Sequence, residues 1–388
     1  MKTEVRPNLF TKPVNLYYML LGSTLSLSIL GVVMVFSASS IYSLENNGST
    51  YAVVLRQIIF LVISIPMAWV LSRLTLTRWK LIARFGAVAS IALLALVQVS
   101  GKRVSGNNNW INIGFIDVQP SEVVKFLMIL WAGFMLAKRE HNGVIETNVI
   151  LLIAPLFVFC MLLVLIGKDL GTASVFALIL AGLLWVSGVR LGVFTGILAV
   201  GFAGLAALIY TAPYRLDRLS VLINPFADGQ YKSTGWQPAH SLLGLASGGF
   251  FGVGLGASRQ KWGNLPAAHT DFIFSVIGEE LGLFGTLSTL ALLSLLLFSI
   301  FRIALRSHEP MVRFVCCGIG CWIAIQTILN IGSAVSVLPV VGVTLPLVSY
   351  GGSALIATYM GIGFVIGAAR RDPKIFEDLK KSDYKWLR

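Results

Sequence analysis

Four ionisable side chains mark the point where a polar stretch gives way to an apolar one: His269, Asp271, Glu279 and Glu280. Ionisable groups in a segment that would lie at membrane depth are costly, so each of them is a candidate for function. A carboxylate placed over an apolar helix can act as a general base or bind a cation. Asp271 is therefore the first residue to test, and the sequence leaves open whether its carboxylate acts as a base or binds a divalent cation.

Each of these acids has a structural alternative. Asp271, or equally Thr270, could accept free N–H groups in the first turn of the helix as an N-cap. Glu279 lies eight residues after Asp271 and therefore roughly on the same helix face, whereas Glu280 is turned away by about 100°. An ion pair or hydrogen bond inside a helical bundle would account for either Glu. We keep Glu279 and Glu280 as supporting polar residues of the site.

Positive side chains accompany these acids. Four lie in the polar stretch before Asp271 and one lies in an apolar segment further upstream, namely Arg215, Arg218, Arg259, Lys261 and Lys125. An Arg can bind a phosphate through two hydrogen bonds, whereas a Lys acts as a point charge. We expect these cations, together with His269, to bind an anionic substrate. Attraction to lipid headgroups is the alternative role for the cations of the polar stretch.

Two further acids stand at predicted helix starts. Glu122 follows Gln-Pro-Ser, and a Glu is favoured near the positive end of a helix dipole. Lys125 lies three residues later inside an apolar segment and needs an acceptor, for which Glu122 is the nearest in sequence. Asp169 precedes Leu-Gly-Thr, where an N-cap is the structural interpretation. Glu122 and Asp169 are kept as supporting polar residues.

The composition indicates which elements must position these residues. Of the 388 residues, 56% are hydrophobic and only 12% are charged, and the mean hydropathy is +0.82. A soluble domain carries about 25% charged residues, so this composition predicts a membrane protein. A crossing helix needs about 20 apolar residues, and such segments lie near 16–40, 57–75, 80–99, 121–137, 146–166, 170–188, 191–211, 271–300, 313–335 and 348–368. We predict an all-α membrane protein, a ten-transmembrane-helix bundle, with one domain over 1–388.

Three segments interrupt the hydrophobic pattern: 101–120, which contains Trp110, then 212–270, and then 338–353. The second is a large extracytoplasmic loop between predicted helices 7 and 8, and loops of this length are usually functional. The third contains two Pro residues and a Gly pair, which break a helix. Such a broken segment is tolerated at membrane depth only where it lines a cavity or is buried in protein. With ten spans all three segments face outward, which predicts a single site there.

The net charge of +13 comes from 30 Lys and Arg against 17 Asp and Glu. A basic chain could bind nucleic acid, but no RNA-binding aromatic motif or basic repeat is present. The positive-inside rule explains the charge better, because 19 of the 30 cations fall in the tails and the even-numbered loops. Both termini are therefore predicted to be cytoplasmic, with short tails 1–15 and 369–388. The first apolar run is too long for a cleaved signal peptide and is interpreted as a span.

Several enzyme classes have no motif in this chain. It lacks a G-x-S-x-G elbow, an HExxH pair, a Walker Lys and a Cys–His pair. The glycines at 252, 254 and 256 lack the strand–helix setting of a nucleotide-binding loop. Cys160, Cys316, Cys317 and Cys321 fall inside apolar segments without metal-ligand spacing, so we interpret them as small buried hydrophobes.

Four motifs, in order along nearly the whole chain, resemble the signature of the SEDS family (shape, elongation, division and sporulation). They are Gln119-Pro120-Ser121-Glu122, Asp169-Leu170-Gly171-Thr172, His269 to Phe274 with Gly278 to Gly282, and Leu345 to Ser353, which includes Ser349. The run Ser258 to Trp262 before Leu265-Pro266 is similar to the cell-division members of the family. The chain departs from the pattern at Gly167-Lys168, where an acidic or Gln residue and a Pro are usual, and the added positive charge argues against a metal at that corner.

The resemblance implies a peptidoglycan glycosyltransferase. It would polymerise lipid II, an undecaprenyl-diphosphate-linked disaccharide peptide, on the outer face of the bacterial cytoplasmic membrane, at the division septum. The implied partners are a class B penicillin-binding transpeptidase, other divisome membrane proteins and membrane lipid. Asp271 corresponds to the essential acidic residue, Trp110 to a functionally important position that we take as substrate-binding, and Ser349 to a supporting polar residue.

These inferences lead to one mechanism. Asp271 would take the proton from the 4-hydroxyl of the acceptor sugar, and an α-linked donor would give a β-1,4 product by inversion in a single displacement. The leaving group is a polyprenyl diphosphate, whose growing charge the cations would stabilise. The alternatives are an elongation-type glycosyltransferase of the same family, a lipid II flippase, in which intramembrane acids and a broken helix would serve transport, and a scaffold for the transpeptidase.

Overall fold

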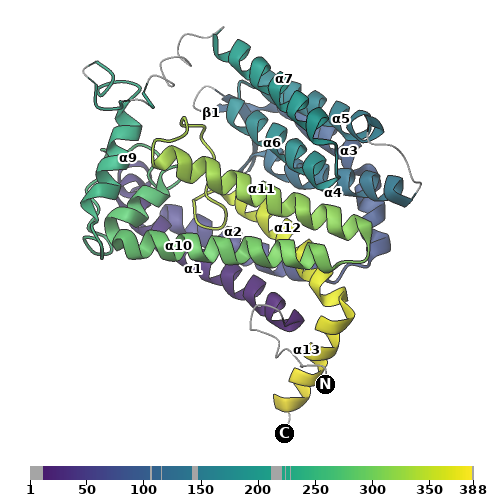
Figure 1. The fold of residues 1–388 in the computed structure, drawn as a ribbon. Coiled ribbons are helices and arrows are strands. Elements are labelled where there is room, and N and C mark those ends of the chain that lie inside the picture. Colours follow the sequence, from purple (N-terminus) through teal and green to yellow (C-terminus); the bar gives the residue numbers. More distant parts are fainter. Residues whose placement is uncertain are drawn as a thin grey trace.

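The computed structural model describes residues 12–104, 107–114, 116–141, 147–210, 221–222, 224–227 and 229–386. Within these residues the chain forms a helical bundle with one small sheet (Figure 1). The elements in chain order are α1 (Pro13–Asn47), α2 (Ala52–Ser72), α3 (Leu76–Ser100), β1 (Lys102–Val104), β2 (Asn107–Ile113), β3 (Ile116–Val118), α4 (Pro120–His141), α5 (Thr147–Ile166), α6 (Leu170–Val186), α7 (Leu191–Tyr210), α9 (Trp236–Ser247), α10 (Ile273–Arg306), α11 (Pro310–Ala334), α12 (Gly352–Arg371) and α13 (Pro373–Trp386).

Eight helices of the described residues are long and apolar enough to cross a membrane: α1, α2, α3, α4, α5, α10, α11 and α12. The protein is therefore a multi-pass membrane protein. Each of the ten predicted segments overlaps a helix, but α6 is an apolar helix of only 17 residues and α7 is not among the eight. Eight crossings are supported by length and composition, and the count of ten stays a prediction.

Small residues let the central helices approach one another closely. A Cβ added at Gly363 or Gly367 of α12 would lie 2.8 Å or 2.7 Å from the carbonyl oxygen of Ala68 or Ser72 in α2. Gly86 of α3 meets the carbonyl of Leu127 in α4 in the same way. Apolar helices in lipid gain little from hydrophobic burial against each other, so close van der Waals packing at small residues holds them together.

The first polar segment is not a plain loop, which the all-α prediction missed. Strands β1, β2 and β3 form an antiparallel sheet in that order, with Ile111 opposite Val118 and Asn112 opposite Asp117. The Asn112 amide also donates to the Asp117 carboxylate at 2.8 Å. Only Ile111-Asn112-Ile113 alternates between apolar and polar residues with the two-residue period of a strand.

Helix α10 is broken at Gly282, whose φ of 67° and ψ of −159° are not helical. The break leaves the carbonyls of Glu279 and Glu280 to accept N–H groups of Val253 and Gly254, which follow α9. A side chain at Gly282 would collide with the backbone of Gly252. The break therefore fastens the loop after α9 onto α10, and it makes this helix two segments rather than the one that was predicted.

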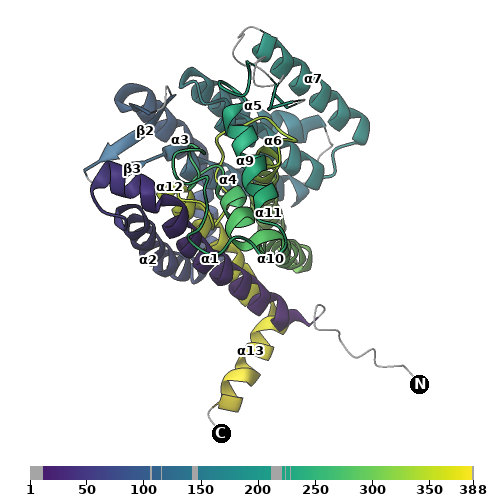
Figure 2. The same ribbon diagram turned by 90° about the vertical axis from the view of Figure 1, so that its left-hand side faces the viewer.

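From residue 338 onward, the structure differs from the prediction in where α12 begins and in the helix found in the tail. Residues 338–351 are irregular, as the Pro and Gly residues indicated, and α12 begins at Gly352 rather than near 348. The tail after α12 contains α13, which was expected to be a short tail and extends away from the bundle (Figure 2). The start of α1 and α13 lie at one end of the bundle, opposite α9 and its loops (Figure 1).

Candidate active site

Asp271 lies in a tight turn that leads into α10. The carbonyl of Ala267 accepts the N–H groups of Thr270, Asp271 and Phe272, and Ala267 itself has a φ of 58°. Helix α10 begins at Ile273, and its N-cap residue is Phe272, without a side-chain cap. The structural alternative, in which Asp271 or Thr270 caps this helix, is therefore wrong.

The Asp271 carboxylate is half-buried and has no hydrogen bond or ion pair with any residue that the structure describes. Beside it lies Gly342 of the broken segment, where an added Cβ would stand 3.7 Å from the Asp271 Oδ2. Burial raises the pKa of Asp271 to about 6. The carboxylate is thus ionised above pH 6 and is more basic than an ordinary Asp, which suits a general base.

Aromatic rings flank the turn. The His269 ring lies 4.9 Å from that of Tyr42 in α1 and 5.7 Å from that of Tyr350. Burial lowers the pKa of His269 to about 4, so its imidazole is neutral at physiological pH. Tyr350 receives a side-chain hydrogen bond from the exposed Arg56 of α2 and is also close enough to Asp117 to interact electrostatically with it. The first and third predicted outward segments and the Asp271 turn therefore meet around Tyr350.

Ser349 supports this arrangement from the broken segment. Its hydroxyl donates to the carbonyl of Thr270 at 2.6 Å and accepts the N–H of Leu345 at 2.8 Å. Leu347 between them is buried with a φ of 66°, a conformation that is rare for a bulky residue. Such strain persists only where the surroundings hold it in place.

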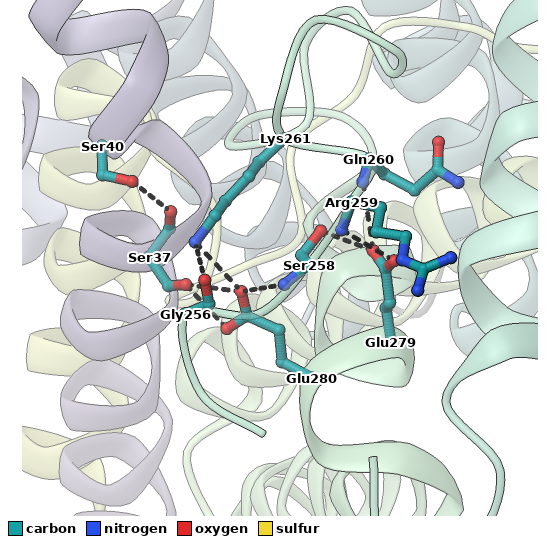
Figure 3. Close-up of polar contacts among 9 residues, drawn as sticks. All are labelled: Ser37, Ser40, Gly256, Ser258, Arg259, Gln260, Lys261, Glu279 and Glu280. Atoms are coloured by element: carbon teal, nitrogen blue, oxygen red, sulfur yellow. Dashed lines mark hydrogen bonds and ion pairs between the residues drawn. The ribbon is translucent and has the colours of Figure 1, made fainter. Parts of the chain in front are cut away.

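Glu279 and Glu280 are both fully engaged within the protein (Figure 3). Glu279 accepts the Ser258 hydroxyl and the N–H groups of Arg259 and Gln260. Glu280 accepts the Ser37 hydroxyl of α1 at 2.6 Å and the N–H of Ser258 at 3.3 Å. The two carboxylates therefore anchor the loop before the Asp271 turn onto α10 and α1.

Lys261 is part of this network and is not offered to a substrate. Its side chain is 5% exposed, and its Nζ lies 3.6 Å from the Glu280 Oε1 and donates to the Gly256 carbonyl. The placement of Lys261 among the substrate cations is corrected for this reason. Arg259, two residues earlier, is exposed and has no ion pair among the described residues, so it stays a candidate.

Lys125 is also occupied. Its Nζ lies 2.7 Å from Glu122 Oε1 and 5.5 Å from the ring centre of Trp322, and its side chain is 1% exposed. The acceptor predicted from sequence spacing is thus the observed one, and the ammonium is held inside the bundle rather than presented to an anionic headgroup. The second oxygen of Glu122 has no partner among the described residues.

Asp169 caps α6, as its structural interpretation states. It accepts the Thr172 N–H at 2.9 Å and the Thr172 hydroxyl at 2.8 Å, and the Asn109 amide of β2 donates to it at 2.6 Å. Gly171 packs against the carbonyl of Val341, so a side chain there would collide with it. Val341 and Gly342 therefore lie between the Asp169 corner and Asp271.

The remaining candidates can be placed only in part. Trp110 lies on β2, opposite Lys102, and is half-buried. Arg215 and Arg218 lie outside the described residues, so nothing tests their role. Within the described part of the chain, no group of three or more His, Cys, Asp or Glu could hold a metal ion.

The sequence pattern of the Cell cycle protein family, which groups FtsW, RodA and SpoVE, matches residues 18–373. The chain belongs to this family. The resemblance to SEDS proteins is thereby confirmed.

Several relatives are similar over most of their length. A probable peptidoglycan glycosyltransferase FtsW of Coxiella burnetii is 39% identical over 353 residues, which cover 89% of this chain and 94% of that one. The corresponding protein of Mycobacterium tuberculosis is 35% identical over 95% of this chain and 70% of its own length. Stage V sporulation protein E of Bacillus subtilis is 33% identical over 93% of this chain and 98% of its own.

Solved structures share the fold. A chain from a peptidoglycan synthase complex that coordinates polymerization and crosslinking superposes with a TM-score of 0.73 at 30% identity, covering 92% of this chain and 98% of that chain. The rod shape determining protein RodA of Thermus thermophilus superposes with a TM-score of 0.68 at 29% identity, covering 91% and 96%.

Four residues near Asp271 were missed by reasoning from the sequence. Tyr42 and Arg56 lie in predicted spans or next to them and have no motif of their own. Gly342 is one of many glycines, and Asn330 is a neutral residue inside an apolar helix. An Asn in a membrane-crossing segment is a weak polar signal, and it was the one available hint.

Proposed function

We propose that this protein is an inverting peptidoglycan glycosyltransferase that polymerises lipid II. The observation that carries the proposal is the carboxylate of Asp271, which has no partner in the part of the chain that the structure describes, within a family whose curated members include probable peptidoglycan glycosyltransferases. In this mechanism Asp271 accepts the proton of the acceptor sugar's 4-hydroxyl. The new C–O bond forms at the donor's anomeric carbon while its bond to the diphosphate oxygen breaks.

The pKa of about 6 supports this role. At neutral pH the carboxylate is ionised and can take a proton, yet it is a stronger base than a solvated Asp. General-base assistance of this kind contributes about 10²- to 10⁴-fold to a rate.

The diphosphate leaving group needs positive charge nearby. Arg259 is exposed and proposed for this role, as is Arg56, which is exposed and also contacts Tyr350, and Arg215 and Arg218 remain proposed for the same role. The neutral His269, between Tyr42 and Tyr350, can contribute a hydrogen bond but no charge. The sugars would contact the rings of Tyr42, His269 and Tyr350, together with Trp110 on the neighbouring sheet. These side chains offer both apolar ring faces and polar atoms.

We also propose ten crossings within one domain over 1–388, with both termini cytoplasmic and the large loop between the seventh and eighth crossings outside. Support comes from the cluster of ion pairs at one end of the bundle. Arg306 pairs with Asp372 at 3.1 Å, Arg313 with Glu140, and Lys80 approaches Glu309 to 4.0 Å. Positive charge is enriched on the cytoplasmic side of membrane proteins.

A class B penicillin-binding transpeptidase is the proposed partner, together with other divisome membrane proteins. The similar chain from a synthase complex that joins polymerization to crosslinking supports this choice. A role in septal division is favoured over elongation by the FtsW relatives at up to 39% identity. A fluorescently tagged copy at the septum would support division, and one along the sidewall would support elongation.

The decisive experiment uses the purified protein with its transpeptidase partner and lipid II in detergent. Glycan polymers should form with the wild type and be absent with Asp271→Asn. Detergent has no second leaflet, so polymer there argues against a pure flippase. Translocation of lipid II in vesicles without any polymer would instead support the flippase alternative. Repeating the assay with EDTA tests whether a divalent cation acts with Asp271.

A further inference from the structure

The turn of residues 267–272, which carries Asp271, is called the catalytic turn below. Three of its consecutive main-chain carbonyls each accept a hydrogen bond from a different donor. The His269 carbonyl accepts the Tyr350 N–H at 2.9 Å, and the Thr270 carbonyl accepts the Ser349 hydroxyl at 2.6 Å. The Asp271 carbonyl accepts the side-chain amide of Asn330, in α11, at 2.8 Å. The backbone of the turn is therefore fixed at every residue, while the Asp271 side chain is left without a partner among the described residues.

Asn330 makes a second contact that sets it apart from the other two donors. Its Nδ2 also donates to the Val343 carbonyl at 2.7 Å, next to the Gly342 that faces the Asp271 carboxylate. One NH₂ group thus joins the turn that carries Asp271 to residues 342–343. We call this backbone segment, which faces the Asp271 carboxylate, the wall. The reverse orientation of the amide would place its oxygen against two carbonyl oxygens, so hydrogen-bond chemistry assigns the nitrogen to this side.

Hydrogen bonds to neighbouring helices hold the end of α11, which carries Asn330. It is 1% exposed and lies one turn before the end of α11, where the Ala334 carbonyl accepts the Ser241 hydroxyl of α9 at 2.6 Å. That hydroxyl also bonds to Ser275 of α10. The end of α11 is therefore tied to both neighbouring helices, so Asn330 can hold the turn in place rather than follow it.

The residue type fits this task closely. A neutral amide supplies two N–H donors without a charge, whereas an Asp supplies none and a Ser only one. The turn also contains Ala267 in the left-handed region, and Leu347, further along the segment that contains the wall, lies in the same region. Both segments would relax if the bridge between them were removed.

We propose that Asn330 is a positioning residue for Asp271: it fixes the distance between the catalytic carboxylate and the wall at Gly342 by bridging their two backbones. This role rests on the proposed glycosyltransferase function. A displacement of about 1 Å at a reacting group can lower a rate roughly 100-fold. The substrate contacts of the exposed cations do not pass through Asn330, so binding should change little.

The test compares Asn330→Ala and Asn330→Gln with Thr327→Val. Thr327 lies one turn earlier in α11, is also buried, and its hydroxyl has no partner among the described residues. Asn330→Ala should lower kcat for lipid II polymerisation by about 10- to 100-fold with little change in KM. Asn330→Gln retains both donors and should restore part of kcat, and Thr327→Val should behave as the wild type.

Hydrogen exchange provides a readout that does not depend on activity. The amides of Thr270, Asp271 and Tyr350 should exchange faster in Asn330→Ala than in the wild type, and not in Thr327→Val. A wild-type kcat with unchanged exchange in Asn330→Ala would overturn the proposal, as would equal losses in Thr327→Val. If the wild type makes no polymer, the proposed function fails, while exchange alone still decides whether Asn330 positions the turn.

Discussion

Asp271, in the turn before α10, and the Glu279–Glu280 pair, within that helix, differ in how their carboxylates are bonded. Asp271 stands two residues before α10, carries no side-chain partner among the described residues, and has its pKa raised to about 6 by burial. Glu279 and Glu280 lie about two turns further on, are 1% and 0% exposed, and receive hydrogen bonds from two segments, α1 and the loop of residues 256–261 (Figure 3). Sequence spacing alone made all three look like candidates of one kind.

The difference shows how the protein uses buried charge. A buried ion without partners is costly, and a network satisfies it only when every acceptor position finds a donor. Glu279 and Glu280 meet that condition and hold the loop of residues 256–261 in place. Asp271 does not meet it, and an unsatisfied carboxylate at a held turn is what a proton-transfer step requires.

The largest effect is expected for Asp271→Asn. Polymerisation should fall by about 10²- to 10⁴-fold, because the amide cannot accept the proton. The variant should insert and fold normally. The folded-state pKa lies above the ordinary value of 3.8, so the stability that protonation provides is lost as pH rises through about 6. The neutral Asn avoids that loss and should raise the melting temperature at pH 7.5.

Wild-type polymerisation by purified Asp271→Asn would remove Asp271 as the base. A lower melting temperature at pH 7.5 would show that the carboxylate has a stabilising partner after all. Circular dichroism melts and a gel assay of glycan length measure the two outcomes separately.

Glu280→Ala should act on stability instead. It leaves the Lys261 ammonium buried without its carboxylate and removes the acceptor of Ser37, and breaking a buried pair of this kind costs about 3–5 kcal/mol. Polymerisation per folded molecule should fall much less than with Asp271→Asn. The double variant Lys261→Met with Glu280→Gln removes both charges and should recover part of the melting temperature. A loss of polymerisation per folded molecule in Glu280→Ala, without a lower melting temperature, would contradict the contrast between Asp271 and Glu280.

The pH dependence sharpens the same contrast. Since Asp271 must be ionised to act, the rate at limiting substrate should fall about tenfold per pH unit below about pH 6 and level off above it. His269 has its pKa lowered to about 4, so it should add no step between pH 5 and 8. A limb centred near pH 4 would indicate a solvated carboxylate rather than the buried one seen here.

The smallest effect is expected for Arg259→Ala. Its guanidinium is exposed, so removal of one of several cations should weaken lipid II binding and lower activity by less than about tenfold, which is about 1.4 kcal/mol. Arg259→Lys retains the charge and should be closer to the wild type. Unchanged binding in Arg259→Ala would assign this cation to lipid headgroups.

Much of the helical pattern could be predicted from hydropathy. The ten predicted segments each overlap a helix, because an apolar run of sufficient length has no other stable structure in lipid. The sheet β1–β3 was missed because its strands are short and the sequence alternates over only three residues, Ile111 to Ile113, which is a weak signal beside long apolar runs. The break at Gly282 was missed because a Gly inside a helix is usually tolerated. Only the folded structure shows why a Gly is needed there: a side chain at Gly282 would collide with the backbone of Gly252.

The site residues divide in a similar way. Lys125 and its acceptor Glu122 are three residues apart, so helix geometry was sufficient to predict their contact. Arg259 and Lys261 are only two residues apart in a loop, and no sequence pattern distinguishes their roles. In the folded protein one is exposed and the other is buried against Glu280, from a different element.

The sequence by itself determined that this is a helical membrane protein of a recognisable family and which acid to test first. Composition and local spacing suffice for that, because helix formation in lipid and motif chemistry are local properties of the chain. Only the tertiary structure decided that Glu279 and Glu280 are satisfied while the Asp271 carboxylate has no partner among the described residues. That outcome depends on Ser37 and residues 258–261, which donate to the two Glu side chains, and on Asn330 and Ser349, which hold the backbone of the Asp271 turn. Packing between distant segments brings these donors together, and no pattern along the chain indicates it.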